Sequence, residues 1–246
     1  MAELTPYVAE FIGTMLLIIF GDGVVANALL ARTKGNILGG TTAGWIVITT
    51  GWAMGVTVGV YASFWASGGH INPAVTIALA SLGLFPWSMV PGYIVSQVLG
   101  AFVGAVIVYL AYMDHFRETQ DKAAKLGVFS TIPQIRSLPK NFVTEVIGTL
   151  VLMLGVLAIT SRQAGVPPYL APALVGFLVW GIGLSLGGPT GYAINPARDL
   201  GPRIAHQLLP IPGKGSSDWV YGATVPIFGP IVGALLGALI WRLYTL

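Results

Sequence analysis

Two asparagines, each followed by Pro-Ala, are the residues in this sequence best placed to do chemistry. Asn72 and Asn195 each follow a glycine-rich segment in an otherwise apolar chain. Asparagine is a strong N-cap residue, and proline suits the first helical position because its missing N–H is not needed there. Each motif therefore predicts a loop that ends at the asparagine and a short helix that starts after it. Two such polar caps in an apolar chain indicate a water-lined cavity.

The composition is that of a membrane protein. Of the 246 residues, 55% are hydrophobic and 9% are charged, whereas a soluble domain carries about 25% charged residues. No charged residue occurs between Gly35 and Met113. Cysteine is absent, which excludes disulfide bonds and thiol chemistry, and the net charge of +3 is too small to predict a nucleic-acid partner. Glu10 interrupts the first apolar stretch, which is therefore predicted to be a span and not a signal peptide.

Six apolar stretches of spanning length position the two asparagines. The segments after the asparagines, Pro73–Leu82 and Pro196–Gln207, are too short to span, since a spanning helix needs about 20 residues. The predicted fold is an all-α membrane protein, in a single domain (residues 1–246), with six transmembrane helices and two re-entrant half-helices. The six predicted spans are Tyr7–Leu30, Thr41–Phe64, Pro86–Met113, Asn141–Thr160, Tyr169–Leu186 and Trp219–Tyr244.

The two halves of the chain repeat each other. The segment AEFIGT around Glu10 matches the segment TEVIGT around Glu145. Each half holds an odd number of spans, so the second half is predicted to lie upside down, as an inverted three-plus-three repeat. The half-helices then enter from opposite faces and meet near the midplane. We assign residues 1–113 to the first repeat, 114–140 to a connecting loop and 141–246 to the second repeat.

With these features the sequence resembles the aquaporin, or major intrinsic protein, family. The resemblance rests on the two Asn-Pro-Ala motifs in an inverted repeat with matched glutamates, and it covers nearly the whole chain. Asp199 directly after Arg198, and Pro226-Ile227 in the last span, are typical of the aquaglyceroporin (glycerol facilitator) branch. The resemblance implies a passive channel for glycerol, other small uncharged solutes and water that excludes protons and ions, and not an enzyme. It also implies a homotetramer with one pore per subunit, in the plasma (cell) membrane.

Two rules disagree about the orientation of the chain. With the cytoplasmic N-terminus that the resemblance implies, the cytoplasmic connections hold only Arg162 and Arg242. The positive-inside rule would instead place the more basic connections in the cytoplasm. We follow the topology that the resemblance implies. The outer connections then hold Arg32, Lys34, Arg117, Lys122, Lys125, Arg136, Lys140, Arg203 and Lys214.

Asn72 and Asn195 are predicted to form the central constriction of the pore. Once its side-chain oxygen makes the cap, each asparagine keeps an NH2 group to donate, beside the positive end of its half-helix. A water molecule bound there donates its hydrogens away and relays no proton, and a cation is repelled. The simpler interpretation is that each asparagine only caps its helix; the presence of two facing caps favours the pore.

A second constriction is predicted around Arg198, three residues into the second half-helix. An unpaired arginine at membrane depth is usually functional, although an arginine that extends to the outer headgroups is the alternative. The matching residue of the first repeat is Val75, so the repeat does not impose the arginine. Gly183 stands where water-selective relatives have histidine, and Tyr192 stands where the glycerol branch often has phenylalanine. The resemblance implies a selectivity filter of Trp52, Gly183, Tyr192 and Arg198.

Backbone carbonyl groups of the two loops are predicted to line the pore as hydrogen-bond acceptors, because extended backbone at membrane depth is tolerated where it lines water. Glu10 and Glu145 have two interpretations. They are proton-relay groups of a transporter, or they accept N–H bonds from the loops and hold the carbonyls outward. Their matched positions favour the second, which is also their family role. The predicted carbonyls belong to Gly68, Gly69, His70, Tyr192, Ala193 and Ile194.

Two other classes of function are compatible with parts of the sequence. An ion- or proton-coupled transporter also uses inverted repeats and broken helices, but Glu10 and Glu145 are the only acids well inside a predicted span. An intramembrane enzyme has no support, because no His/Glu metal spacing and no Ser–His pair falls at membrane depth. No cofactor and no metal site is predicted. Asp199 is expected to brace its half-helix or a neighbouring loop, and structural or surface roles are expected for Asp22, His115 and His206.

Overall fold

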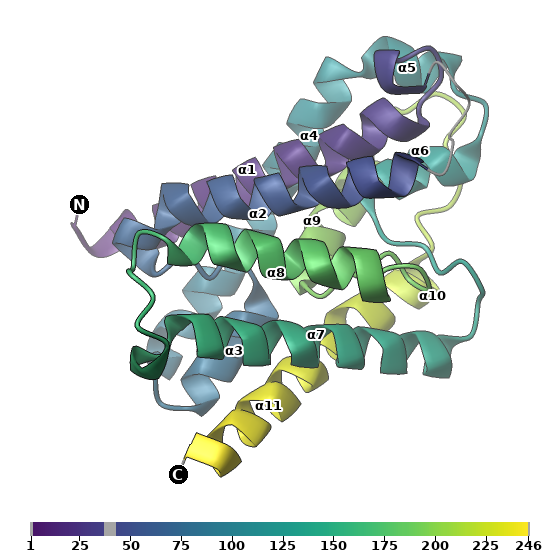
Figure 1. Ribbon diagram of the computed structural model, residues 1–246. Coiled ribbons are helices and arrows are strands. Elements are labelled where there is room, and N and C mark those ends of the chain that lie inside the picture. Colours follow the sequence, from purple (N-terminus) through teal and green to yellow (C-terminus); the bar gives the residue numbers. More distant parts are fainter. Residues whose placement is uncertain (1, 37–42, 246) are drawn as a thin grey trace.

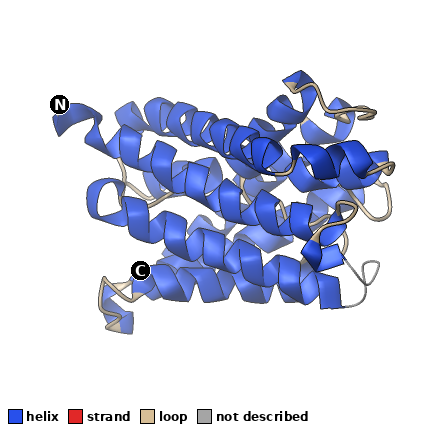
Figure 2. Ribbon diagram, turned by 90° about the horizontal axis from the view of Figure 1, so that it is seen from above, coloured by secondary structure: helices blue, strands red, loops and turns tan. Residues whose placement is uncertain are grey.

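The structure is a computed structural model that describes residues 2–36 and 43–245. Thr41, the expected start of the second span, lies outside the described residues. All regular elements in the described ranges are helical (Figure 2). Short 3-10 turns lie at Ala2–Leu4, Lys34–Asn36, Trp87–Met89 and Arg162–Ala164. The α-helices are α1 (Thr5–Leu29), α2 (Ala43–Ser67), α3 (Pro73–Ser81), α4 (Val90–Ala111), α5 (Met113–Glu118), α6 (Lys122–Phe129), α7 (Leu138–Thr160), α8 (Ala171–Leu186), α9 (Pro196–Leu208), α10 (Trp219–Gly222) and α11 (Val225–Thr245).

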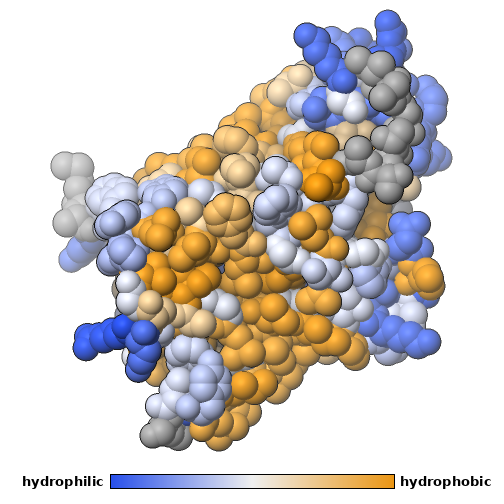
Figure 3. Space-filling view, in the orientation of Figure 1, coloured by the Kyte–Doolittle hydropathy of each residue, from blue (hydrophilic) through white to orange (hydrophobic). Residues whose placement is uncertain are grey.

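Five helical segments within the described residues are long and apolar enough to cross a membrane: α1, α2, α4 with the turn before it, α7, and α10 with α11. The remaining predicted span is α8, whose 16 residues extend over about 24 Å, somewhat less than the hydrocarbon core of about 30 Å. It is shorter than predicted because the chain makes a turn at Pro167–Leu170 before the helix starts. Apolar side chains cover the middle of the face seen in Figure 3, and polar side chains gather at its two ends.

The two predicted half-helices are confirmed as α3 and α9. Each starts directly after its asparagine, with proline at the first helical position. They have nine and thirteen residues, so neither spans a membrane alone. Just beyond α3, Gly83 has a φ of +72°, the left-handed conformation that commonly ends helices. Each half-helix packs against the last span of the other half of the chain, α3 against α11 and α9 against α4.

Glycines bring the helices of each half into close contact. A side chain on Gly100 of α4 would collide with the carbonyl group of Phe11 in α1. In the same way, a side chain on Gly233 of α11 would collide with the carbonyl group of Val146 in α7. Small residues allow such approach between helices in lipid, where the hydrophobic effect does not drive association. The two contacts occupy matching places in the two halves of the chain.

Two segments differ from the prediction: one predicted loop contains a helix, and one predicted span is divided into two helices. The connection 114–140, predicted as a loop, contains α6, whose first turn is capped by Asp121. The last predicted span is divided into α10 and α11 around Ala223 and Thr224. Pro226 has no N–H to donate to the carbonyl group four residues earlier, so the helix is interrupted there.

Candidate functional site

Two cavities meet in the interior of the molecule. One has a volume of about 250 Å³, extends along both loops and is lined from both halves of the chain, Asn72 and Asn195 included. The other has a volume of about 340 Å³ and lies beside α6 and the segment that follows it. The two linings share Trp52, Tyr192 and Arg198. Three of the four residues predicted for the second constriction therefore lie where the cavities meet.

The two asparagines are linked to each other's loops. Asn72 Oδ1 accepts the N–H of Ala74 at 2.9 Å, and Asn195 Oδ1 accepts the N–H of Ala197 at 3.0 Å, which are the predicted caps. Each Nδ2 also donates to a backbone carbonyl of the opposite loop at 2.8 Å, Asn72 to residue 194 and Asn195 to residue 71. These reciprocal bonds were not predicted from the sequence. They use one amide hydrogen of each asparagine and leave the second for the cavity that both residues line.

Glu10 lies fully buried behind the first loop. Its Oε1 accepts from Ser67 Oγ at 2.6 Å and from the N–H of His70 at 2.9 Å. Its Oε2 accepts from the N–H of Ile71 and from Gln97 Nε2, both at 2.7 Å. The φ of +42° at Ile71 is unusual for a β-branched residue. The carboxylate therefore stabilises a strained loop conformation.

Glu145 makes the matching contacts behind the second loop. Its Oε1 accepts from Thr190 Oγ1 at 2.6 Å and from the N–H of Ala193 at 2.9 Å, and its Oε2 accepts from the N–H of Ile194 at 2.8 Å. Tyr192 and Ile194 have φ values of +39° and +43°. The two glutamates thus serve two loops with the same kind of strain.

The peptide planes turn loop carbonyls away from the two glutamates. In a trans peptide, a C=O group points opposite to the N–H of the next residue. The loop N–H groups bound to each glutamate therefore direct the preceding carbonyls the other way. Those carbonyls belong to Gly69, His70, Tyr192 and Ala193. All six residues predicted to supply pore carbonyls line the first cavity, but the carbonyl of Ile194 already accepts from Asn72 Nδ2.

Arg198 and two aromatic rings form the junction of the cavities. The guanidinium carbon of Arg198 lies 3.9 Å from the ring centroid of Trp52. Gly183 does not border the junction directly, because the ring of Tyr192 covers it. A Cβ atom on Gly183 would lie 2.8 Å from Tyr192 Cζ. The missing side chain of Gly183 thus makes room for the tyrosine ring, and its carbonyl accepts from Trp45 Nε1 at 3.1 Å.

Comparisons with known proteins identify the family. The Major intrinsic protein family model matches residues 1–241. The chain belongs to the major intrinsic protein family. It is similar to the "Probable glycerol uptake facilitator protein" of Thermotoga maritima, with 60% identity over 97% of this chain and 99% of that protein. It is 55% identical to the "Glycerol uptake facilitator protein" of Bacillus subtilis over 97% of this chain and 84% of that protein. Its fold is similar to the X-ray structure of the aquaglyceroporin from Plasmodium falciparum, with a TM-score of 0.83, 30% identity, and coverage of 97% of this chain and 95% of that one.

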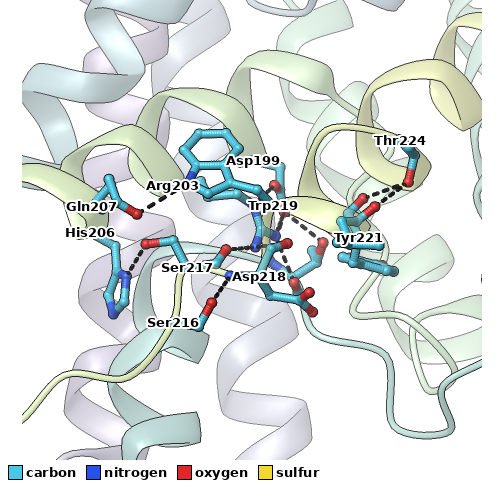
Figure 4. A network of polar contacts seen from close by, with 12 residues as sticks. Asp199, Arg203, His206, Gln207, Ser216, Ser217, Asp218, Trp219, Tyr221 and Thr224 are labelled. Atoms are coloured by element: carbon cyan, nitrogen blue, oxygen red, sulfur yellow. Dashed lines mark hydrogen bonds and ion pairs between the residues drawn. The ribbon is translucent and has the colours of Figure 1, made fainter.

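In this major intrinsic protein, an ion pair that the sequence analysis overlooked braces the second half-helix. Asp199 Oδ2 accepts from the N–H and the hydroxyl of Thr131, as expected of a residue that braces a neighbouring loop. Arg203 Nε donates to Asp199 Oδ1 at 2.7 Å, and Arg203 Nη1 donates to the carbonyl of Ser217 at 2.6 Å (Figure 4). Arg203 is fully buried, so assigning it to an outer connection was wrong. Its spacing of four residues from Asp199 on one helix was the available signal.

Two further polar residues of α1 and α4 differ from expectation. Gln97 of α4, which the sequence analysis missed, donates to Glu10 and to Thr76 and is fully buried. Asp22 is also fully buried, and α1 continues to Leu29, so the prediction that only the two glutamates lie well inside a span was wrong. The other two residues given structural or surface roles make backbone or side-chain hydrogen bonds, His115 with the carbonyl of Ala31 and His206 with Ser217 Oγ.

Proposed function

We propose that this protein is a passive transmembrane channel for glycerol, other small uncharged solutes and water, and not an enzyme. The observation that carries the proposal is the junction of two cavities at Trp52, Tyr192 and Arg198. This junction combines apolar rings with a guanidinium donor, which suits a solute with carbon atoms on one side and hydroxyl groups on the other. The glycerol uptake facilitators of Thermotoga maritima and Bacillus subtilis support glycerol as the solute.

A glycerol molecule at the proposed filter contacts the protein in two ways. Its carbon atoms lie against Trp52 and Tyr192, and its hydroxyl groups accept from Arg198. The loop carbonyls along the first cavity then accept from the same hydroxyl groups as the solute moves inward. Gly183 contributes by leaving space for the Tyr192 ring. These contacts replace hydration of the hydroxyl groups.

The proposed barrier to protons and ions lies at Asn72 and Asn195. Each has one amide hydrogen available to the cavity, beside the N-terminus of its half-helix. A water molecule there accepts from the amides and cannot donate to them, so a chain of water molecules is interrupted in its proton relay. The positive helix ends add repulsion for cations.

Support of the loops is the role we propose for Glu10 and Glu145. The four oxygens of their two carboxylates accept hydrogen bonds from seven donors, which belong to the end of α2, to the two loops and to α4. These bonds hold each carboxylate behind its loop, on the side opposite to the loop carbonyl groups that point away from the glutamates. No observation on the described residues favours a proton-relay role and hence a coupled transporter.

We also propose the assembly and topology that the family resemblance implies: a homotetramer in the plasma membrane with a cytoplasmic N-terminus. The two repeats are residues 1–113 and 141–246, joined by 114–140. Both chain ends lie at the same end of the molecule in Figure 1, as an even number of spans requires. The count of Lys and Arg residues in the connections opposes this orientation, but several of those residues have structural partners. Lys214 Nζ donates to three carbonyls at the end of α9, Lys125 Nζ donates to the carbonyl of Pro212, and Arg203 is buried.

Reconstitution in liposomes tests the proposed function. Stopped-flow light scattering measures glycerol and water permeability, with and without an imposed proton gradient, against protein-free liposomes. We expect glycerol flux that doesn't depend on the gradient, with no proton current. Glycerol flux that requires a gradient, or a proton current carried by the protein, would contradict a passive channel.

A further inference from the structure

Asp22 is a buried carboxylate that the proposed solute path does not use. It lies inside α1, is 0% exposed, and neither of its oxygens has a hydrogen-bond partner in the described part of the chain. Glu10 and Glu145, by contrast, accept bonds on both oxygens. Burying a carboxylate without compensation is costly, and an ionisable residue at membrane depth points to a function and a partner. The partner of Asp22 therefore has to be found among its neighbours.

Arg198 has the complementary deficit. Its Nη1 is a buried donor with no hydrogen-bond partner among the described residues. Its guanidinium lies over the ring of Trp52. The same ring packs against Gly21, the residue before Asp22, so closely that a side chain on Gly21 would collide with it. Trp52 thus connects the segment of α1 that holds Asp22 with the guanidinium of the proposed filter.

The charges in this region leave Arg198 as the base that balances Asp22. Asp199 and Arg203 form a direct ion pair, with Nε and Oδ1 2.7 Å apart and both side chains 0% exposed. Burial is the largest influence on the Asp22 carboxyl; the next is an attraction to Arg198, followed by a repulsion from Asp199. Since Arg203 already neutralises Asp199, one acid and one base remain. A cluster of two acids and two bases is neutral overall, which lowers the cost of burying each charge.

We propose that Asp22 is the counter-charge of Arg198. It is a positioning residue: it holds the guanidinium at the wall of the constriction and does not touch the solute. In a medium of low polarity, this attraction acts over separations too long for a hydrogen bond. The inference rests on the proposed channel function for its transport test, whereas its spectroscopic test does not need transport.

The spectroscopic test replaces Arg198 and detects whether the Asp22 carboxylate becomes protonated. If Asp22 balances Arg198, then Arg198→Val leaves Asp22 as an uncompensated buried carboxylate, which takes up a proton. The infrared spectrum of Arg198→Val, minus that of the wild type, gains a carboxylic-acid C=O band. That band is absent from Asp22→Asn/Arg198→Val. Valine is the matched residue of the first repeat, Val75, so the substitution suits a half-helix of this kind.

The transport test is a double-mutant cycle on the ratio of glycerol to water permeability. Asp22→Asn keeps the size of the side chain and lowers this ratio about fivefold, the equivalent of one hydrogen bond to the solute. In the Arg198→Val background, Asp22→Asn changes nothing further, because the residue through which it acts is gone. The matched control is Asp114→Asn, which removes an exposed carboxylate paired with Arg117 and leaves the ratio unchanged.

The two tests separate the possible failures. A C=O band of Asp22 already present in the wild type, or no band gained in Arg198→Val, overturns the counter-charge. An equal effect of Asp22→Asn in both backgrounds also overturns it, since the residue then acts on packing and not through Arg198. Absence of glycerol flux in the wild type overturns the proposed function, while the infrared result still decides the role of Asp22.

Discussion

Substitution of Gly183 by alanine tests how the proposed constriction is built. The Cβ atom of an alanine would lie 2.8 Å from Tyr192 Cζ and 3.0 Å from Thr49 Cγ2, where ordinary van der Waals contact begins at 3.4 Å. The ring of Tyr192 therefore has to move by at least about 0.6 Å to restore contact distance. It packs against Trp45 and borders the junction of the cavities, so we expect it to move toward Arg198.

The magnitude follows from overpacking and from the size of the solute. Inserting one methyl group into a packed site costs about 1–3 kcal/mol, and about 1.4 kcal/mol corresponds to a tenfold change. We therefore expect Gly183→Ala to lower glycerol permeability about tenfold or more, since the solute has to displace the ring again. Water has a smaller cross-section and should be affected less. The larger substitution Gly183→His should abolish glycerol flux and retain water flux.

Stopped-flow measurements on liposomes with equal amounts of protein check this prediction. The matched control is Gly181→Ala on the same helix, where an added Cβ meets nothing within 4 Å. The compensating variant Gly183→Ala/Tyr192→Leu removes the part of the ring that collides and should restore glycerol flux. If Gly183→Ala conducts glycerol at the wild-type rate, or if the double variant fails to recover it, the ring of Tyr192 does not transmit the effect of residue 183.

Three further predictions concern polar contacts that stabilise the fold. Glu10→Gln should reduce thermal stability less than Glu10→Ala, because alanine leaves loop N–H groups unsatisfied at about 1–3 kcal/mol each; loss of transport in a folded Glu10→Gln protein would favour a proton relay. Arg203→Ala should destabilise the protein by about 3–5 kcal/mol, measured by chemical unfolding, since it leaves Asp199 buried without its base; a change below about 1 kcal/mol would contradict this. The hydrogen bonds from the Arg136 guanidinium lower the pKa of Asp218 in the folded protein. The pair therefore stabilises the fold fully at pH values above the unfolded pKa of about 3.9, and this stabilisation is lost as the pH falls through the lower pKa of the folded state. The difference in melting temperature between wild type and Arg136→Gln should therefore vanish in acid; a constant difference would show that the pair does not cause it.

The amino-acid sequence by itself determined the features that depend on local bonding or on composition. The caps at Asn72 and Asn195 join atoms two residues apart, so the motif alone predicts where α3 and α9 begin. The low charge content requires a membrane. The internal repeat placed Glu10 and Glu145 beside equivalent loops, and the structure shows both accepting loop N–H groups.

Only the tertiary structure decided which distant groups meet. Each asparagine donates to a carbonyl more than 100 residues away, and Tyr192 covers Gly183, because packing of the two halves brings these segments together. Asp22 is interior because α1 continues past it and packs against α2 and α4, which hydrophobic periodicity does not reveal in a helix that is apolar on all sides. Charge counting along the chain likewise treats Arg203 as a loop charge, whereas burial beside Asp199 makes it part of the interior. The sequence thus specified the elements and their ends, and the packing between them decided the partners of the buried polar groups.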